Sequence, residues 1–316
     1  MSQPDLTYFP NFFRSPQIAV TPKKLLDPGD AVFTIGSCFA LEVRRALKAA
    51  GFATYPDYAA VAYDRAAEIF DKIPEREMPA HYDTFTMRQE IEAALGVWTD
   101  REAGFLEVRN APVNDMLKAP TAVQDPFRKL TYATTAARLR DLSARIDQVV
   151  REGLERARLF VITLGLTETW QDNKTGKYIC RPPGAGYGGG DASTATFRAS
   201  TFQQNYDNTK AMIDLLLSRF PGKHIVLSVS PVRLEKTFRA MDVGTANVES
   251  KSILRAVAGQ ISDEYRQSVT YYPSYEMALG QLGALTGTKG VFEDDGRHVR
   301  RDFVNAVTQT FVKLIT

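Results

Sequence analysis

The chain has 316 residues, of which 44% are hydrophobic and 24% are charged. This composition is sufficient for a sizeable buried core and excludes an intrinsically disordered chain. Because 39 Lys and Arg are balanced by 37 Asp and Glu, without a long basic block, the sequence gives no indication of nucleic-acid binding. With only two cysteines and three histidines, neither a disulfide framework nor a metal centre is expected, and no cofactor is expected either.

Residues 1–29 carry five prolines interleaved with aromatic residues, which predicts an extended segment packed along the body rather than a helix. The sequence shows neither the basic and apolar regions of a signal peptide nor an apolar run long enough to span a membrane. Together with two cysteines that fit a reducing compartment, these features predict a cytoplasmic protein.

Strands and helices alternate at the start of the chain and again after residue 155. The apolar run Ala31–Ile35 predicts a buried strand, a helix is expected to begin near Ser37, and Phe52–Tyr55 is a candidate second strand. Further strands are expected at 159–165, 224–231 and 269–273, helices at 202–220 and 246–265, and a final amphipathic helix through Phe303, Val307, Phe311 and Leu314. This alternation predicts a single α/β domain over 1–316, built on a doubly wound parallel sheet.

Residues 57–155 interrupt this alternation, and we expect them to form a mainly helical insertion that covers one edge or face of the domain. Its expected elements are helices at 63–73, 88–95 and 136–154 and a hairpin at 96–108. A second irregular stretch contains the glycine-rich run 184–190. That run lacks the Gly-Lys-Ser/Thr ending of a phosphate-binding loop, so a lid or a plain loop is expected there.

Residues 36–40 read Gly-Ser-Cys-Phe-Ala, at the carboxyl end of the first expected strand and the amino end of the first expected helix. Open α/β sheets bind ligands beyond the carboxyl ends of their strands, and a helix amino terminus favours negative charge. Ser37 is therefore a candidate nucleophile, with Gly36 and Cys38 beside it where an oxyanion would develop. The alternative is that Ser37 is only an N-cap, a position that serine prefers.

The segment Asp295-Gly296-Arg297-His298 directly precedes the final helix. Its spacing lets the Asp295 carboxylate reach the His298 imidazole and hold one tautomer while the other nitrogen faces outward. A segment at this place in the chain can share the sheet edge with Ser37, where the three residues would supply a nucleophile, a base and its orienting acid. Taken alone, the motif also fits a solvated turn.

Other residues have weaker claims to a functional role. His224 opens a strand at the opposite end of the sheet, which favours a structural role. His81 belongs to the insertion and either approaches a substrate or, as we expect, lies at the surface. Cys38 is either a second nucleophile or a small buried residue of the first helical turn. Thr167 and Glu168 follow the expected strand 159–165 and either contact an oxyanion or substrate or begin a helix.

Eight segments together give the chain a specific resemblance that covers nearly its full length. They are residues 36–40, 82–90, 125–128, 164–170, 228–232, 250–255, 272–276 and 295–298. With these segments the chain resembles the GSCFA domain family, which belongs with the SGNH (GDSL-like) hydrolases. The resemblance implies a flavodoxin-like sheet with Ser37 as nucleophile, His298 as general base and Asp295 as its orienting carboxylate.

The chain departs from the SGNH pattern at the oxyanion hole. Thr167, followed by Glu168, occupies the place of the asparagine in the third SGNH block, and a second-block glycine is not identifiable. The Ser37 N–H would then need a substitute donor, for which Thr84 and Arg88 of the insertion are candidates. Loss of one oxyanion donor without replacement costs about 10²–10³ in rate.

The resemblance implies an ester hydrolase or O-acyltransferase that works through an acyl-Ser37 intermediate. The expected substrate is a polar, carbohydrate-linked or small-molecule acyl ester, and an activated donor such as acyl-CoA is compatible with transfer. Hydrolysis and transfer share the first half-reaction, so the sequence leaves both open. The alternative is a catalytically weak binding or scaffold protein with the same fold, which the missing asparagine favours.

Overall fold

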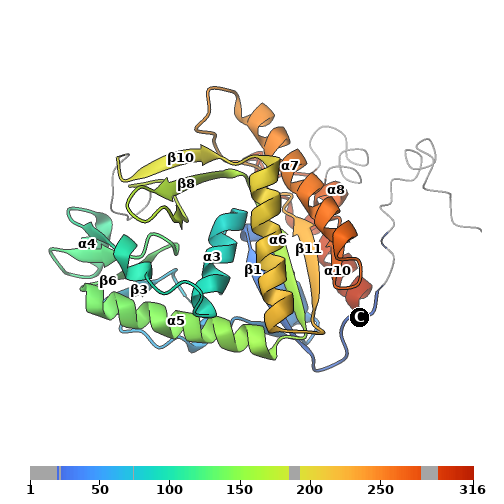
Figure 1. Ribbon diagram of the computed structural model, residues 1–316, viewed down its shortest axis with the longest axis horizontal. Coiled ribbons are helices and arrows are strands. Elements are labelled where there is room, and N and C mark those ends of the chain that lie inside the picture. Colours follow the sequence, from blue (N-terminus) through green and yellow to red (C-terminus); the bar gives the residue numbers. More distant parts are fainter. Residues whose placement is uncertain (1–19, 21–22, 74, 185–192, 279–290) are drawn as a thin grey trace, which may run out of the picture.

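The computed structural model describes residues 20, 23–73, 75–184, 193–278 and 291–316. Its centre is a five-stranded parallel sheet in the order β12-β11-β7-β1-β2 (Figure 1). The strands are β1 Ala31–Gly36, β2 Ala53–Tyr55, β7 Leu159–Leu164, β11 His224–Val229 and β12 Val269–Tyr272. This is the 2-1-3-4-5 order of flavodoxin-like sheets. The doubly wound α/β fold predicted from the alternating pattern is confirmed, with each of its expected strands.

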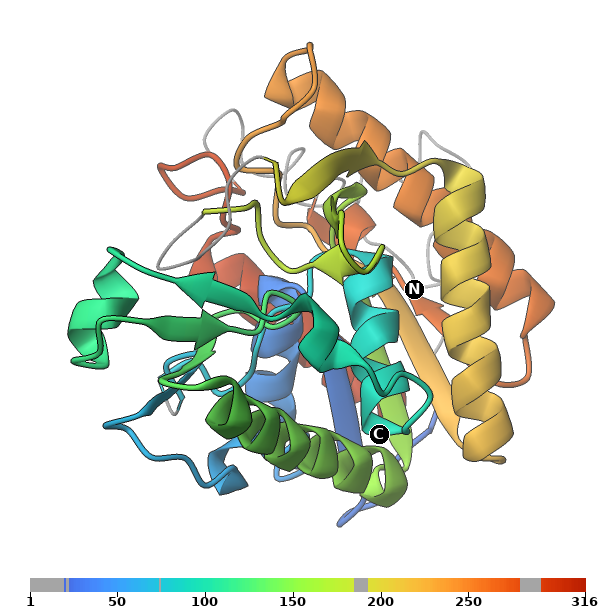
Figure 2. The same ribbon diagram turned by 60° about the vertical axis from the view of Figure 1, so that its left-hand side comes forward.

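Helices cover both faces of the sheet (Figure 2). One face packs against α2 (Cys38–Ala49) and α10 (Arg301–Ile315), with Val32, Leu159 and Val226 in the interface. The other face, with Phe33, Phe160 and Ile225, is covered by α3 (Thr84–Ala94), α5 (Ala136–Arg156), α6 (Phe202–Arg219) and α7 (Val243–Glu264). Successive strand residues point to opposite faces, so the continuous apolar runs fill both interfaces.

The described residues before β1 run along the carboxyl-terminal helix. The backbone N–H groups of Lys23 and Leu25 donate to the carbonyls of Leu314 and Ile315 at 2.8 Å. Leu26 is buried against the same face of the sheet. For this part of the segment, extended packing along the body is confirmed, and residues 1–19 lie outside the described chain.

Residues 57–155 contain an antiparallel sheet that the sequence analysis did not predict. Its order is β3-β6-β5-β4, and in Figure 1 it lies at the left with α5 running below it. Its strands are β3 Glu68–Phe70, β4 Leu106–Val108, β5 Ala122–Gln124 and β6 Thr131–Ala133. Single-turn helices η1 (Tyr58–Ala60) and η2 (Arg101–Gly104) and the short α4 (Pro112–Met116) connect them. The longest helix of this stretch, α5, is the crossover between β2 and β7.

Two elements expected in this stretch are wrong. The pattern at 63–73 predicted a helix, but Glu68–Phe70 pairs with Thr131–Ala133, and Asp71 and Lys72 have φ values of 34° and 53° that end any helix there. The hairpin expected at 96–108 does not form, because β4 pairs instead with β5. In both cases pairing with a strand distant in the sequence overrides the local pattern.

A third sheet follows β7. It is antiparallel, in the order β10-β8-β9, with β8 Glu168–Asp172, β9 Tyr178–Ile179 and β10 Ala195–Ala199. The alternative that Thr167 and Glu168 begin a helix is therefore wrong: Glu168 pairs with Ala199 as the first residue of β8. Most of the glycine-rich run 184–190 lies outside the described residues. Among the residues that are described, no helix is long and apolar enough to cross a membrane.

Candidate active site

Ser37 lies where β1 turns into α2. β2 and β7 flank β1 on opposite sides, so the chain reverses direction across the sheet between β1 and β7, and ligands bind at such a point beyond the strand ends. Ser37 is the N-cap of α2: its Oγ accepts from the Phe39 N–H at 3.4 Å, and its own N–H is 3.4 Å from the Thr163 carbonyl oxygen. Its side chain is nearly covered, with 4% of the residue exposed. The N-cap role is thus present, and it is compatible with a further role.

Two glycines permit close packing around Ser37. A Cβ on Gly36, whose φ is +148°, would stand 2.4 Å from the Thr163 carbonyl oxygen. A Cβ on Gly165 would stand 2.3 Å from the Tyr82 carbonyl oxygen and 3.2 Å from the Ser37 Cβ. Both distances to oxygen are below any normal contact, so these positions accept only glycine without movement of the backbone.

The segment before α3 bridges the ends of the two central strands. The His81 N–H donates to the Gly36 carbonyl at 2.9 Å, and the Leu166 N–H donates to the Tyr82 carbonyl at 2.8 Å. A part of the 57–155 stretch therefore lies directly at the switch point beside Ser37.

Cys38 and Tyr82 form the polar side of this site. Cys38 Sγ is 3.6 Å from the Tyr82 hydroxyl, which accepts from Lys129 Nζ at 3.0 Å. Cys38 is half-exposed, so the expectation of a buried small residue is wrong. Its place in the first turn of α2 leaves the side chain at the mouth of the site rather than in the interface between α2 and the sheet. The pKa of the Tyr82 hydroxyl is raised, mainly by burial and to a smaller extent by the nearby Cys38.

Asp295 and His298 contact each other in the turn of a short hairpin closed by the Phe292–Val299 bridge. His298 Nδ1 is 2.5 Å from Asp295 Oδ2, and Asp295 Oδ1 accepts from the backbone N–H groups of Arg297 and His298 at 2.9 Å each. These bonds, led by that to the imidazole, hold the pKa of Asp295 well below its usual range. The pairing expected from the spacing is present and leaves Nε2 unblocked by the carboxylate.

The hairpin is fixed at the carboxyl edge of the parallel sheet. Arg233, in the loop that leaves β11, donates to the Gly296 carbonyl at 3.1 Å, and Arg297 Nε donates to the Arg233 carbonyl at 3.3 Å. The Arg297 guanidinium adds to the lowering of the Lys251 pKa that burial causes. Within the described chain, the His298 ring contacts Asp295 and Arg297, and no hydrogen bond joins it to Ser37.

Lys251 is a residue of the site that the sequence analysis did not single out. Its ammonium is buried and donates to the Gly165 carbonyl at 2.5 Å, while Ser250 Oγ accepts from the Thr167 N–H at 3.0 Å. Burial, assisted by Arg297, lowers the pKa of Lys251 to about 7. The Ser-Lys-Ser run at 250–252 was visible in the sequence, but only the packing of α7 shows that it holds the Gly165–Thr167 segment.

The other candidate residues have polar partners elsewhere. The Glu168 carboxylate accepts from the Thr237 hydroxyl at 2.6 Å and pairs with Arg239 at 3.0 Å, so it anchors the loop after β11. The Thr84 hydroxyl, at the start of α3, donates to Asn205 Oδ1 at 3.0 Å. Arg88 pairs with Glu92 at 2.6 Å and also reaches Asn208. Among the described contacts, none joins these three side chains or Thr167 to the Ser37 hydroxyl.

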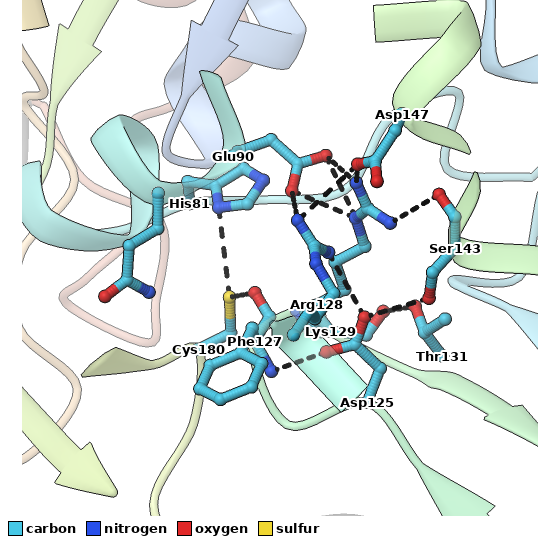
Figure 3. Close-up of polar contacts among 12 residues, drawn as sticks. His81, Glu90, Asp125, Phe127, Arg128, Lys129, Thr131, Ser143, Asp147 and Cys180 are labelled. Atoms are coloured by element: carbon cyan, nitrogen blue, oxygen red, sulfur yellow. Dashed lines mark hydrogen bonds and ion pairs between the residues drawn. The ribbon is translucent and has the colours of Figure 1, made fainter. Parts of the chain in front are cut away.

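His81 is buried, so its expected surface position is wrong. Its residue is 1% exposed, its Nδ1 lies 3.8 Å from Cys180 Sγ, and burial lowers its pKa to about 4 (Figure 3). The polarity of the surrounding sequence gave no sign that this segment enters the interior. His224, by contrast, lies at the amino end of β11, opposite the Ser37 edge as expected; it is half-buried, with Nε2 2.8 Å from the Thr270 hydroxyl.

Beside His81 lies a buried ion-pair network. Arg128 contacts Glu90 at 2.9 Å and also pairs with Asp147 (Figure 3). Arg101 contacts Asp125 at 3.2 Å. Burial favours the neutral form of Glu90, but the Arg128 and Arg101 guanidiniums lower its pKa to about 2. The segments 82–90 and 125–128, which share in the sequence resemblance, thus interlock in space. Nowhere in the described chain do three His, Cys, Asp or Glu side chains gather as metal ligands would.

Comparison with known proteins gives one family match. A search of curated proteins finds no match. A solved structure titled "BT4096 a gut microbial diltiazem-metabolizing enzyme" aligns with 10% identity and a TM-score of 0.37, covering 93% of this chain and 48% of that one. This chain thus spans about half the length of that protein. The model of the GSCFA family matches residues 31–311, and the chain accordingly belongs to the GSCFA family.

Proposed function

We propose that the protein is a serine-dependent ester hydrolase or O-acyltransferase of the SGNH type. The observation that carries this proposal is the placement of Ser37 at the β1/β7 switch point together with a carboxylate-bound imidazole, His298, on the same edge of the sheet. Residues 1–316 would act as one SGNH-like domain, with 57–155 as an insertion that contributes to the site.

In the proposed reaction, Ser37 Oγ attacks the ester carbonyl carbon while His298 Nε2 takes its proton. Asp295 holds the Nδ1 proton and stabilises the imidazolium. Backbone N–H groups at the start of α2 would donate to the oxyanion, assisted by the dipole of the helix. Collapse releases the alcohol, which takes the proton from His298, and leaves acyl-Ser37. Water or an acceptor hydroxyl then completes hydrolysis or transfer.

A second candidate, a binding or scaffold protein on the same fold, is favoured by two observations. Ser37 is 4% exposed, and its hydroxyl contacts Phe39 N rather than His298. Catalysis would require the His298 hairpin to approach Ser37, since a base must come within hydrogen-bond reach of its nucleophile; such bonds are often long before substrate binds.

A fluorophosphonate probe, which phosphonylates an activated serine, separates the two candidates. We expect wild type to be labelled, Ser37→Ala to be unlabelled and His298→Ala to lose labelling while its thermal unfolding midpoint is retained. Ser218→Ala, at an exposed position of α6, serves as the serine control and should label as wild type does. An unlabelled wild type, or equal labelling of Ser37→Ala, would favour the scaffold.

A further inference from the structure

Three cationic side chains converge on the Tyr82 side of the site: Arg76, Lys129 and Arg181, here called the cation cluster. Lys129 Nζ is 3.0 Å from the Tyr82 hydroxyl, which in turn is 3.6 Å from Cys38 Sγ. Arg181 and Lys129 line the same small cavity. The turn that carries Arg76 is held beside Lys129 by the bond from Asp71 N to the Leu130 carbonyl at 2.7 Å.

The charges of the cation cluster have little neutralisation from the protein. Arg76 and Arg181 are half-buried, and neither guanidinium has a hydrogen bond or ion pair with any residue of the described chain. Lys129 is 7% exposed, and its ammonium donates to a neutral hydroxyl. Burial lowers the pKa of Lys129, and the positive charge of Arg76 lowers it further. An arrangement of this kind is stabilised when an anion enters it.

The acidic groups nearby do not cancel this charge. Asp71 is fully buried with neither carboxyl oxygen hydrogen-bonded, and burial raises its pKa to about 7, so it is only partly ionised at neutral pH. Glu77 lies next to Arg76 in sequence, but its carboxylate pairs with Arg45 and Lys48 at 3.2 and 3.1 Å. Asp172 lines the same cavity as Lys129 and Arg181, and its carboxylate accepts from the Thr175 N–H and hydroxyl at 2.8 and 2.5 Å. The three cations are therefore only partly balanced, by Asp172 and a partly protonated Asp71.

We propose that the cation cluster binds an oxyanion group, a carboxylate, phosphate or sulfate, carried by the molecule that occupies the site beside Ser37. Two guanidiniums can each form paired hydrogen bonds to such a group, and the ammonium adds a point charge. The assignment of this group to an ester substrate rests on the proposed function. Binding of the oxyanion itself does not, because it requires no chemistry at Ser37.

Cys38 provides a reporter of this charge, because its thiol is half-exposed and linked to Lys129 through Tyr82. Iodoacetate and iodoacetamide alkylate thiols alike but differ in charge, so their rate ratio at Cys38 measures the local potential. We expect that ratio, followed by mass spectrometry, to be about fivefold higher in the folded protein than at the same thiol in urea. Cys180 is buried and should stay unmodified in the folded protein.

Substitution of the two arginines tests whether they raise the iodoacetate to iodoacetamide rate ratio at Cys38. Arg76→Gln and Arg181→Gln should each lower the ratio, and the double variant should lower it further towards the unfolded value, with Lys129 retaining part of the preference. Arg219→Gln, an exposed arginine at the end of α6, should leave the ratio unchanged. A ratio in wild type equal to that of the unfolded chain, or one insensitive to both cluster substitutions, would overturn the proposal.

Competition identifies the oxyanion. Succinate, phosphate and sulfate are added separately at constant ionic strength. The anion that binds the cation cluster should slow carboxymethylation of Cys38 in wild type, and the rate should level off as the site fills. The double variant should not show this effect. Equal slowing by all salts in both proteins would show general screening and overturn the proposal. Because these readouts involve no turnover, failure of fluorophosphonate labelling with intact anion protection would refute only the serine-enzyme assignment.

Discussion

Replacing Gly165 by alanine tests the close packing at the switch point. The added Cβ would stand 2.3 Å from the Tyr82 carbonyl oxygen and 3.1 Å from its carbonyl carbon, both backbone atoms, and 3.2 Å from Ser37 Cβ. Gly165 does not have a positive φ, so alanine meets a purely steric obstacle rather than a conformational one. The Tyr82 carbonyl can move away only by stretching its bond from the Leu166 N–H.

Overpacking of this kind costs about 1–3 kcal/mol, and a weakened backbone hydrogen bond adds about 1 kcal/mol. We therefore expect Gly165→Ala to lower the free energy of unfolding by about 2–4 kcal/mol. The urea midpoint measures this change, with an unchanged m-value as the sign that the denatured state is unaffected. Because the displaced atoms adjoin Ser37, fluorophosphonate labelling should also fall by more than the folded fraction does.

Gly244→Ala is the matched control. Gly244 also lacks a positive φ, and its Cβ would meet only the Asp242 side chain, at 3.1 Å, in the exposed first turn of α7. Helix propensity favours alanine there by up to about 1 kcal/mol, so this variant should be as stable as wild type or slightly more stable. Equal urea midpoints for Gly165→Ala and Gly244→Ala would show that the Gly165 site has room for a Cβ.

Three further predictions concern buried charges. Arg128→Met leaves Glu90 buried without its closest partner and should lower the free energy of unfolding by about 3–5 kcal/mol in urea, whereas Arg109→Met at an exposed pair should change it by less than about 1 kcal/mol. The pKa of His81 is about 4 in the folded protein and 6.5 in the unfolded chain. As the pH drops from 6.5 to 4, the unfolded chain takes up the proton first, so the free energy of unfolding falls. His81→Gln should remove up to about 3 kcal/mol of that fall. The pKa of Lys251 is about 7 in the folded protein against 10.5 in the unfolded chain, so the free energy of unfolding rises with pH above 7. Lys251→Met should remove about 2–3 kcal/mol of the rise between pH 7 and 9. An unchanged dependence of the free energy of unfolding on pH would show that the ammonium is not desolvated.

The parallel sheet could be predicted because its signal is local. The run at 159–164 is apolar on both faces, as a central parallel strand requires, and the residue types at 36–38 mark a strand that gives way to a helix. The Asp295–His298 pair could also be predicted, since three residues and a glycine turn fix its geometry within one segment. These features depend on neighbours in the sequence.

The unexpected features depend on partners far along the chain. Glu68–Phe70 has a helical pattern by itself and becomes a strand only because Thr131–Ala133 lies beside it. His81 is buried because its segment bridges β1 and β7, which no property of residues 79–84 reveals. The place of Lys251 in the site likewise depends on the packing of α7, which brings its ammonium to the Gly165 carbonyl.

The buried ion pairs connect the insertion to the site. Glu90 lies on α3, and the residues that directly precede α3 form the bridge from Gly36 to Leu166. A buried pair is rarely better for stability than a hydrophobic contact of similar size, but its geometry is more specific. By fixing α3 against Arg128, the network also fixes where Tyr82 and Lys129 lie relative to Ser37. Loss of the Arg128 contact should therefore reduce the iodoacetate preference of Cys38 even under conditions where the chain remains folded.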